Sequence, residues 1–109
     1  MILHAVYCSV LSEIERNEVT ALFQRLEALC ERLDGALSFE GGPNRDFEQK
    51  SKIYSDGFII RFESADALKR YAEHPTHKEL GAQLCAFCDG GADGIIVFDL
   101  EVEARQASA

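Results

Sequence analysis

The chain has 109 residues, of which 47% are hydrophobic and 28% charged, and its 19 acidic and 11 basic residues give a formal net charge of −8. This length and hydrophobic content are typical of one soluble globular domain and exclude a disordered chain. The acidic balance excludes nucleic acid as an expected partner, because that affinity depends on Lys and Arg side chains that neutralise phosphates.

The sequence also indicates where the protein acts. No apolar run approaches the roughly 20 residues that a membrane span requires, and the first ten residues, MILHAVYCSV, lack the basic leader of a secretory signal. We therefore expect a cytoplasmic protein with no membrane partner, whose four cysteines are free thiols. Residues 1–104 are expected to form one domain, followed by a flexible tail over residues 105–109.

The first third of the chain predicts a strand followed by a long helix. Residues 2–11 are aliphatic and too few for a stable helix, so they predict a strand. Ser12 and Glu15 form a capping-box pair, which predicts that a helix begins there and runs to about Leu33. Its apolar residues recur at helical spacing. Gly35 is expected to adopt the left-handed backbone conformation that ends the helix.

The middle of the chain predicts two strands and a second helix. Residues 36–42 and 55–63 predict strands, separated by a polar loop rich in turn residues. Ser64 is the expected cap of a helix over residues 65–73. Pro75 ends that helix, because proline disfavours helical geometry in the residue before it.

The last third predicts a short third helix and a final strand. Thr76 and Glu79 form another capping box, and residues 94–102 predict the strand. The element order is therefore β-α-β-β-α-(short α)-β, which is typical of an α+β ferredoxin-like fold: an antiparallel sheet with its helices on one face.

The helix-free face of this sheet is expected to be apolar. Its apolar residues are Leu3, Tyr7, Ile59, Ile96, Phe98, Leu100 and Val102. Contiguous apolar surface of this kind is costly to leave in water. We therefore expect a second copy to cover it, which gives a two-fold homodimer with the architecture of a dimeric α/β barrel.

The stretch YAEHPTHKEL, residues 71–80, holds the candidate catalytic residues Tyr71 and His77. His77 lies in the first turn of a helix, where the helix dipole favours a neutral imidazole that accepts protons. His4 interrupts an apolar strand on the face toward the helices, and Asp56 starts a neighbouring strand on that face. One hypothesis is that His4, Asp56, Tyr71 and His77 line a single functional pocket. The alternative is that they have only structural roles, as core, turn and helix-cap residues.

An apolar pocket between helices and sheet would bind a small apolar or aromatic ligand. Its expected walls are Phe23, Leu26, Phe58, Leu84, Ile95 and Val97. Asp99 lies within an apolar strand and needs a polar partner if it is buried. The C-x-x-C of Cys85 and Cys88 lacks the further ligands that a zinc site requires, so we expect neither a metal nor another cofactor.

The residues FES-x-x-A-L-x-x-Y-x-x-HP-x-H, the early histidine and the last strand IIVFD resemble the stress-responsive dimeric α/β-barrel (Dabb) family over nearly the whole chain. The resemblance implies a ferredoxin-like homodimer. One member is a polyketide cyclase, olivetolic acid cyclase, whose tyrosine and second histidine of this element are acid/base groups; their counterparts are Tyr71 and His77. The early histidine matches His4, and Asp56 stands where the cyclase has another histidine.

Three functions remain open at this point. The first is a dimeric stress-response protein that binds a small molecule, with His4, Tyr71 and His77 at the polar end of its pocket. The second is a cyclase or lyase-type enzyme in which His77 removes an acidic proton and Tyr71 stabilises the resulting enolate. The third is a purely structural stress protein.

Overall fold

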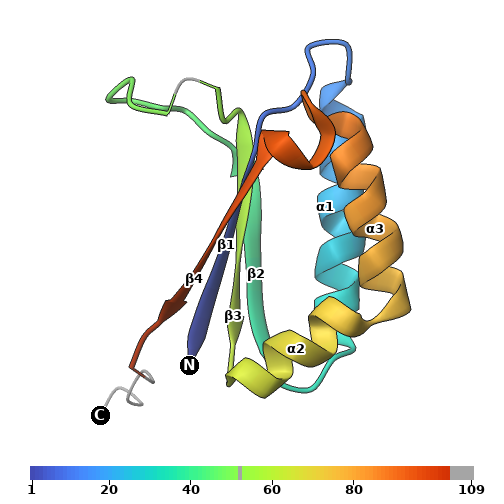
Figure 1. Cartoon of the computed structure of the whole chain (residues 1–109), viewed down its shortest axis with the longest axis vertical. Coiled ribbons are helices and arrows are strands. Elements are labelled where there is room, and N and C mark those ends of the chain that lie inside the picture. The colour runs from blue at the N-terminus through green and yellow to red at the C-terminus, as the bar shows by residue number, and fades with distance from the viewer. Residues whose placement is uncertain (52, 104–109) are drawn as a thin grey trace.

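The computed structural model describes residues 1–51 and 53–103, which form one sheet with a layer of helices on one of its faces (Figure 1). The expected flexible tail, residues 105–109, lies outside the described residues. The elements are β1 (Ile2–Cys8), α1 (Arg16–Glu31), β2 (Ala36–Pro43), β3 (Asp56–Phe62), α2 (Ala65–Glu73), α3 (Pro75–Phe87), the 3-10 helix η1 (Gly91–Gly94) and β4 (Ile95–Glu101). No helix among the described residues has the length and apolar content needed to cross a bilayer.

The four strands are all antiparallel and lie in the order β2-β3-β1-β4. This is the predicted α+β ferredoxin-like arrangement, and β1 occupies a central place between β3 and β4. In the register of the sheet, His4 lies opposite Ile60 of β3 on one side and Asp99 of β4 on the other. Alternation along β1 therefore points His4, Val6 and Cys8 toward the helices.

Two helix starts differ from the sequence prediction. α1 begins at Arg16, and the Glu18 carboxylate accepts a hydrogen bond from the Glu15 N–H over 2.9 Å, so the capping box lies three residues later than the predicted one. Helix α3 begins at Pro75, and its cap is His74, whose Nδ1 accepts from the Thr76 N–H over 3.1 Å. In both helices another side chain accepts from an N–H that the predicted capping box would have used. Glu18 accepts from the Glu15 N–H, and His74 accepts from the Thr76 N–H.

Helix lengths also differ from the prediction. The third helix has 13 residues against 9 for α2, so the helix expected to be short is the longer of the two. α1 ends at Glu31, two residues before the predicted end, while Gly35 has the expected left-handed backbone with φ of 88°. A side chain at Gly35 would also meet the Ala67 Cβ at 2.6 Å, so this position requires glycine both for its backbone and for close packing of the turn on α2.

The core lies between the helices and the sheet. Phe23 of α1 packs edge-to-face on Phe58 of β3 with ring centroids 5.2 Å apart, and Phe39 of β2 stacks on Phe58 at the same distance. Tyr71 and Phe62 fill the other end of the core, 5.2 Å apart. Aromatic pairs of this kind add stability beyond the area that they bury.

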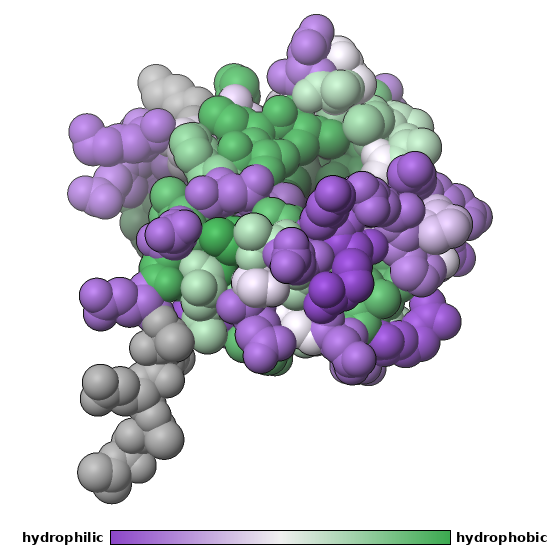
Figure 2. All heavy atoms as spheres, turned by 60° about the horizontal axis from the view of Figure 1, so that its bottom comes forward, coloured by the Kyte–Doolittle hydropathy of each residue, from purple (hydrophilic) through white to green (hydrophobic). Residues whose placement is uncertain are grey.

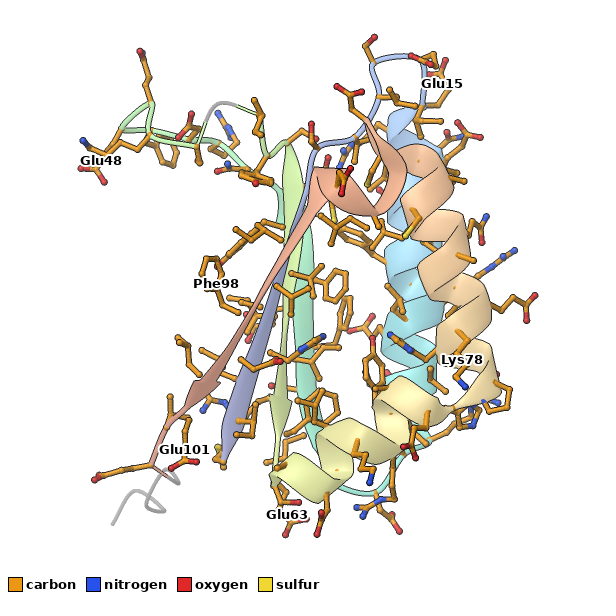
Figure 3. The ribbon with its side chains drawn as sticks, in the orientation of Figure 1. Glu15, Glu48, Glu63, Lys78, Phe98 and Glu101 are labelled. Atoms are coloured by element: carbon orange, nitrogen blue, oxygen red, sulfur yellow. The ribbon has the colours of Figure 1, made fainter. Side chains whose placement is uncertain are left out.

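The opposite face of the sheet carries no helix among the described residues, and it is apolar as predicted. Figure 3 shows Phe98 on this side, pointing away from the helix layer. Exposed fractions are 37% for Ile59, 47% for Phe98 and 51% for Leu100. The β2–β3 connection projects from one end of the sheet toward the same side (Figure 1), and we call its residues 44–51 and 53–55 the arm.

Candidate functional site

Three of the predicted site residues meet at one place between the sheet and the helices. His4 comes from β1, Tyr71 from α2 and His77 from α3. The ring centroids of Tyr71 and His77 are 4.3 Å apart, and those of Tyr71 and His4 are 5.9 Å apart. His4, which is more than sixty positions away from the other two residues in the sequence, thus joins them in one contiguous cluster. We call it the His4–Tyr71–His77 cluster.

The tight turn between α2 and α3 positions His77. His74 ends α2 and also caps α3, and Pro75 stands at the first position of α3, where its missing N–H costs nothing. His77 then lies one turn away from the end of α2, and its Nδ1 donates a hydrogen bond to the Ala72 carbonyl over 3.1 Å. Because Nδ1 carries the proton in this bond, Nε2 of the neutral ring keeps a free lone pair.

The carboxylate of Asp99 orients His4, a pairing that the sequence did not predict. Asp99 of β4 lies opposite His4 in the sheet, and His4 Nδ1 is 2.5 Å from Asp99 Oδ1. The His4 side chain is 12% exposed and that of Asp99 is 45% exposed, so the pair lies at the open edge of β4. The carboxylate holds the proton on Nδ1, which leaves Nε2 of the neutral His4 ring as an acceptor.

Tyr71 is the most enclosed member of the cluster, with 1% of its surface exposed. Burial raises the pKa of its hydroxyl, so the phenol stays protonated across the physiological range. None of the hydrogen bonds among residues 1–51 and 53–103 involves this hydroxyl, although no buried polar atom in this part of the chain lacks a partner. The Tyr71 hydroxyl oxygen is therefore not completely buried, and it is available to donate a hydrogen bond.

His77 gives the cluster a pH dependence. Burial lowers the pKa of His77 below its ordinary 6.5, and the neighbouring His4 and His74 act in the same direction. A depressed folded pKa means that the unfolded chain binds more protons, so this contribution to stability is present above pH 6.5 and is lost as the pH falls through the folded pKa.

We expect the free energy of unfolding of the wild type to fall faster than that of His77→Gln between pH 7.5 and 5. Urea denaturation at several pH values measures this difference, because the acidic residues that both chains share contribute equally. Parallel pH profiles for the two chains would contradict the expectation.

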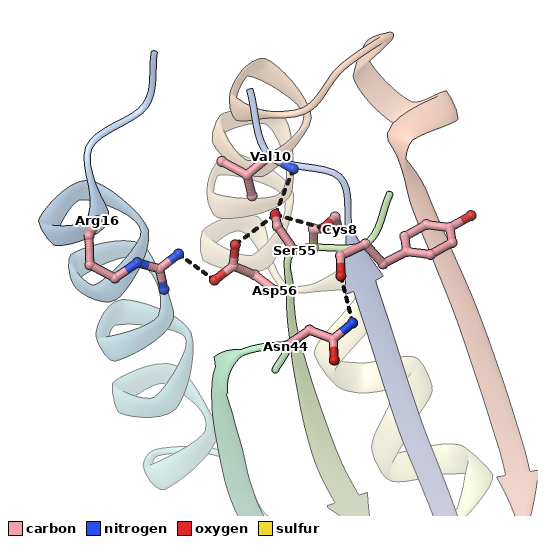
Figure 4. A network of polar contacts seen from close by, with 7 residues as sticks. Cys8, Val10, Arg16, Asn44, Ser55 and Asp56 are labelled. Atoms are coloured by element: carbon pink, nitrogen blue, oxygen red, sulfur yellow. Dashed lines mark hydrogen bonds and ion pairs between the residues drawn. The ribbon is translucent and has the colours of Figure 1, made fainter. Parts of the chain in front are cut away.

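Asp56 does not belong to the cluster, so the predicted proximity of His4 and Asp56 is wrong. Asp56 lies opposite Cys8 in the sheet, four positions along β1 from His4. It is 1% exposed, and its Oδ1 is 2.5 Å from Arg16 Nη2 of α1 (Figure 4). The Ser55 hydroxyl donates to its other oxygen over 2.9 Å. Sequence reasoning missed Arg16 because nothing in a lone arginine at a helix start identifies a partner forty residues away.

The predicted pocket walls fall into two groups. Phe23, Leu26, Phe58 and Leu84 are at most 6% exposed and fill the core itself. Ile95 is half-buried and Val97 is 47% exposed, so the helix-facing side of β4 is open near Asp99. Figure 2, which brings the α2 end of the molecule forward, shows apolar residues gathered in patches among polar ones. The open part of the helix-facing layer is thus its β4 edge.

The cysteines have the properties of core residues. Cys8 is fully buried and Cys88 is 3% exposed, while Cys85 is half-buried in the last turn of α3. Burial raises the pKa of Cys8 to about 12 and also raises that of Cys88, which keeps both thiols protonated and unreactive. Within residues 1–51 and 53–103, no group of three or more His, Cys, Asp or Glu side chains is arranged to hold a metal ion.

A second concave region, which the sequence did not predict, lies on the helix-free face. Its volume is about 570 Å³, and it lies where the arm leaves the sheet. Tyr7, Gly57 and Ile59 of the sheet line it together with Asn44 and Tyr54 of the arm. The signal for it in the sequence is a pair of glycines, Gly42 and Gly57, which the register places opposite each other on neighbouring strands.

Fold and cluster together define the class of protein: a small ferredoxin-like α+β domain with paired histidines and a tyrosine under its helices. The family model described as Stress responsive A/B Barrel Domain (Dabb) matches residues 2–102. The chain belongs to this family.

Solved structures agree with the fold. A dimeric ferredoxin-like protein of unknown function from Jannaschia sp. is 44% identical, with a TM-score of 0.87, over 93% of this chain and 98% of that one. A hydroxynitrile lyase from Passiflora edulis is 11% identical, with a TM-score of 0.79 and coverage of 97% and 96%. A cofactor-independent oxygenase from Streptomyces nogalater is 20% identical, with a TM-score of 0.73 and coverage of 97% and 94%. No curated protein matches the sequence.

Proposed function

We propose that this protein is a homodimer that binds a small apolar or aromatic molecule at the β4 edge of its helix-facing layer. The cluster of His4, Tyr71 and His77 forms the polar end of that site, and Val97 contributes its apolar wall. The observation that carries the proposal is the convergence of three polar side chains from β1, α2 and α3 on one place. Ligand sites typically combine apolar walls with a few convergent polar groups of this kind.

The free atoms of the cluster support a ligand with a carbonyl or hydroxyl group. Asp99 occupies Nδ1 of His4, and the Ala72 carbonyl occupies Nδ1 of His77. His77 therefore offers Nε2 as an acceptor, as the neutral form of His4 also does, while the protonated Tyr71 offers a hydroxyl hydrogen. A ligand that carries one acceptor and one donor would satisfy these groups, whereas a plain hydrocarbon would leave them unpaired at a cost.

The homodimer rests on the helix-free face. Ile59 of β3 and both Phe98 and Leu100 of β4 expose apolar surface there, and Ala5 of β1 lies between Ile59 and Phe98. The protein from Jannaschia sp., which shares 44% of its residues, is dimeric and ferredoxin-like. A second copy that covers this face removes the apolar patch from water, which is the usual solution for such surfaces.

Acid–base catalysis is the second candidate, and one feature favours it over passive binding. The pKa directions differ within the cluster: burial keeps Tyr71 protonated and His77 neutral. In this proposal His77 Nε2 removes a proton from a carbon next to a carbonyl, and the Tyr71 hydroxyl donates a hydrogen bond to the oxygen on which charge develops. The substrate class is a polyketide-like or aromatic carbonyl compound.

We expect the wild type to sediment as a dimer at micromolar concentration and to bind one or more members of a library of aromatic and polyketide-like carbonyl compounds. In titration calorimetry, Tyr71→Phe should weaken that binding by about tenfold, which corresponds to one hydrogen bond. His74→Asn is the matched control, because asparagine also caps helices and His74 lies outside the cluster.

Three outcomes separate the hypotheses. Equal affinity of Tyr71→Phe, His77→Gln and the wild type would remove the cluster from the ligand site. Turnover that both substitutions abolish, with binding retained, would assign catalysis to Tyr71 and His77. A monomer in sedimentation would contradict the homodimer.

A further inference from the structure

The helix-free face is uneven along the strands, and its two ends have opposite shapes. At one end, Gly42 and Gly57 lie opposite each other on β2 and β3 and form the floor of the 570 Å³ concave region described above. A Cβ at Gly57 would meet the Tyr7 ring at 2.7 Å, so the neighbouring tyrosine leaves no room for a side chain there. Gly42 differs: a Cβ there would meet no atom within 4 Å.

The other end of the face carries large side chains at the corresponding positions. Along β3, the residues on this face after Gly57 are Ile59, two positions later, and Arg61, four positions later. Arg61 lies opposite Leu3 of β1. Leu3 in turn lies opposite Leu100 of β4, which is 51% exposed. Arg61 Nη1 lies 3.3 Å from the Met1 sulfur, a weak acceptor that leaves the charge of the guanidinium uncompensated.

Charge is as uneven as shape. The register gives the strand positions on this face, and Arg61 and Glu40 are the charged residues among them. Glu40 is exposed, lies on the edge strand β2 opposite Ile59, midway along the strands, and borders the concave region. No ion pair within residues 1–51 and 53–103 involves Arg61 or Glu40.

Consider two helix-free faces packed on each other, with a two-fold axis between them that runs perpendicular to the strands at the level of Ile59. This axis places the glycine end of one face against the Arg61 end of the other. This operation reverses the strand direction, so the bulky end of one protomer lies on the concave end of the other. Arg61 of each protomer then lies above Gly57 of its partner. That position is one diagonal step in the sheet, about 7–8 Å, from Glu40, which is within the length of an arginine side chain.

We infer that Arg61 of each protomer enters the concave region of the second copy and pairs with its Glu40. The inference rests on the proposed homodimer and adds its register. The same operation brings the two Glu40 carboxylates toward each other on the axis, so the two arginines also neutralise what would be a like-charge contact. The pair thereby selects one arrangement of the two sheets among those that apolar contact alone would permit.

Charge exchange tests the pairing. Arg61→Glu would place four carboxylates at the interface, and we expect the dissociation constant of the dimer to rise about 100-fold, as measured by sedimentation equilibrium. Glu40→Arg would place four guanidinium groups there and should weaken the dimer similarly. The double variant Arg61→Glu/Glu40→Arg restores two opposite pairs, and we expect its dissociation constant to return to within about tenfold of the wild type.

Arg25→Glu is the matched control, because it makes the same charge change on the exposed side of α1, in the helix layer. It should leave the dimer unchanged. Circular dichroism of each variant confirms that the fold persists. A wild-type monomer would overturn the homodimer and the pairing together, whereas a wild-type dimer that tolerates both single reversals would overturn the pairing alone. Failure of the double variant to recover would also overturn it.

The shape complementarity has its own test at Gly42. Because a Cβ there meets nothing within 4 Å, Gly42→Leu leaves the protomer undisturbed and places a side chain in the concave region that the partner occupies. We expect at least a tenfold weaker dimer. Gly81→Leu is the control: its Cβ also meets nothing within 4 Å, but it lies on α3. Equal dimer affinity of the two variants would contradict occupation of the concave region by the partner.

Discussion

Tyr71→Ala is expected to lower the free energy of unfolding by roughly 3–5 kcal/mol, the usual cost of truncating a large buried ring. Tyr71 is 1% exposed and packs against Phe62, His4 and His77, so its removal leaves a cavity under α2 that these rings cannot fill. Since small domains have a total stability of about 5–15 kcal/mol, the change should be obvious in urea denaturation at fixed protein concentration.

Tyr71→Phe is the informative partner of this variant. It keeps the ring and removes the hydroxyl, which makes no hydrogen bond to the described residues, so its stability should stay within about 1 kcal/mol of the wild type. If Tyr71→Phe is as unstable as Tyr71→Ala, the hydroxyl has a structural role and the cluster loses its free donor. If Tyr71→Ala is as stable as the wild type, the packing described for the ring is incorrect.

Arg16→Ala is expected to lower the free energy of unfolding by roughly 2–3 kcal/mol. The substitution leaves the Asp56 carboxylate, which is 1% exposed, with Ser55 as its remaining hydrogen-bond donor. Removing one partner of a fully buried pair costs about 3–5 kcal/mol, and the expected loss is smaller here because Arg16 is 52% exposed and water reaches the pair from its side.

Arg25→Ala on the same helix is the control, and it should change the stability by less than about 0.5 kcal/mol, as exposed substitutions usually do. The double variant Arg16→Met/Asp56→Leu removes both charges and should recover much of the loss, because no unpaired buried charge remains. Equal stabilities of Arg16→Ala and Arg25→Ala would show that the pair does not anchor α1 to the sheet.

This anchor has a consequence for the site. Asp56, Ser55 and the carbonyl of Cys8 tie the start of β3 to the end of β1, and Arg16 ties both to α1 (Figure 4). The His4–Tyr71–His77 cluster lies at the other end of the same sheet. The two polar groups are therefore separate: one holds a helix on the sheet, and the other has the free atoms that the proposed ligand would meet.

Local sequence patterns were sufficient where the physical cause is local. The Ser64 cap and the apolar spacing of residues 65–73 predicted α2 with its observed bounds, because a hydroxyl that meets an N–H three residues later needs no distant partner. The capping boxes at Ser12 and Thr76 were wrong for the opposite reason. Several polar side chains stood near each helix start, and the path of the chain decided that Glu18 and His74 met the free N–H groups.

The candidate site divides in the same way. Alternation along β1 and helical spacing in α2 predicted that His4 and Tyr71 face the same layer, and the helix start after Pro75 indicated His77 as a neutral imidazole. Sheet register, which no local pattern determines, decided the partners: it placed Asp99 rather than Asp56 opposite His4. A strand can pair in several registers with similar hydrogen bonding, and packing of the whole core selects one.

The sequence by itself determined the order of strands and helices, the apolar character of both sheet faces and the residue types of the cluster, since these follow from period, capping and composition. Only the tertiary structure decided that Asp99 orients His4, that Arg16 neutralises Asp56, and that the helix-free face is concave at its glycine end and bulky at Arg61. Each of these depends on contacts between residues that are distant in the chain. Such contacts arise from the simultaneous packing of all elements, so the spacing of residues along the chain does not encode them.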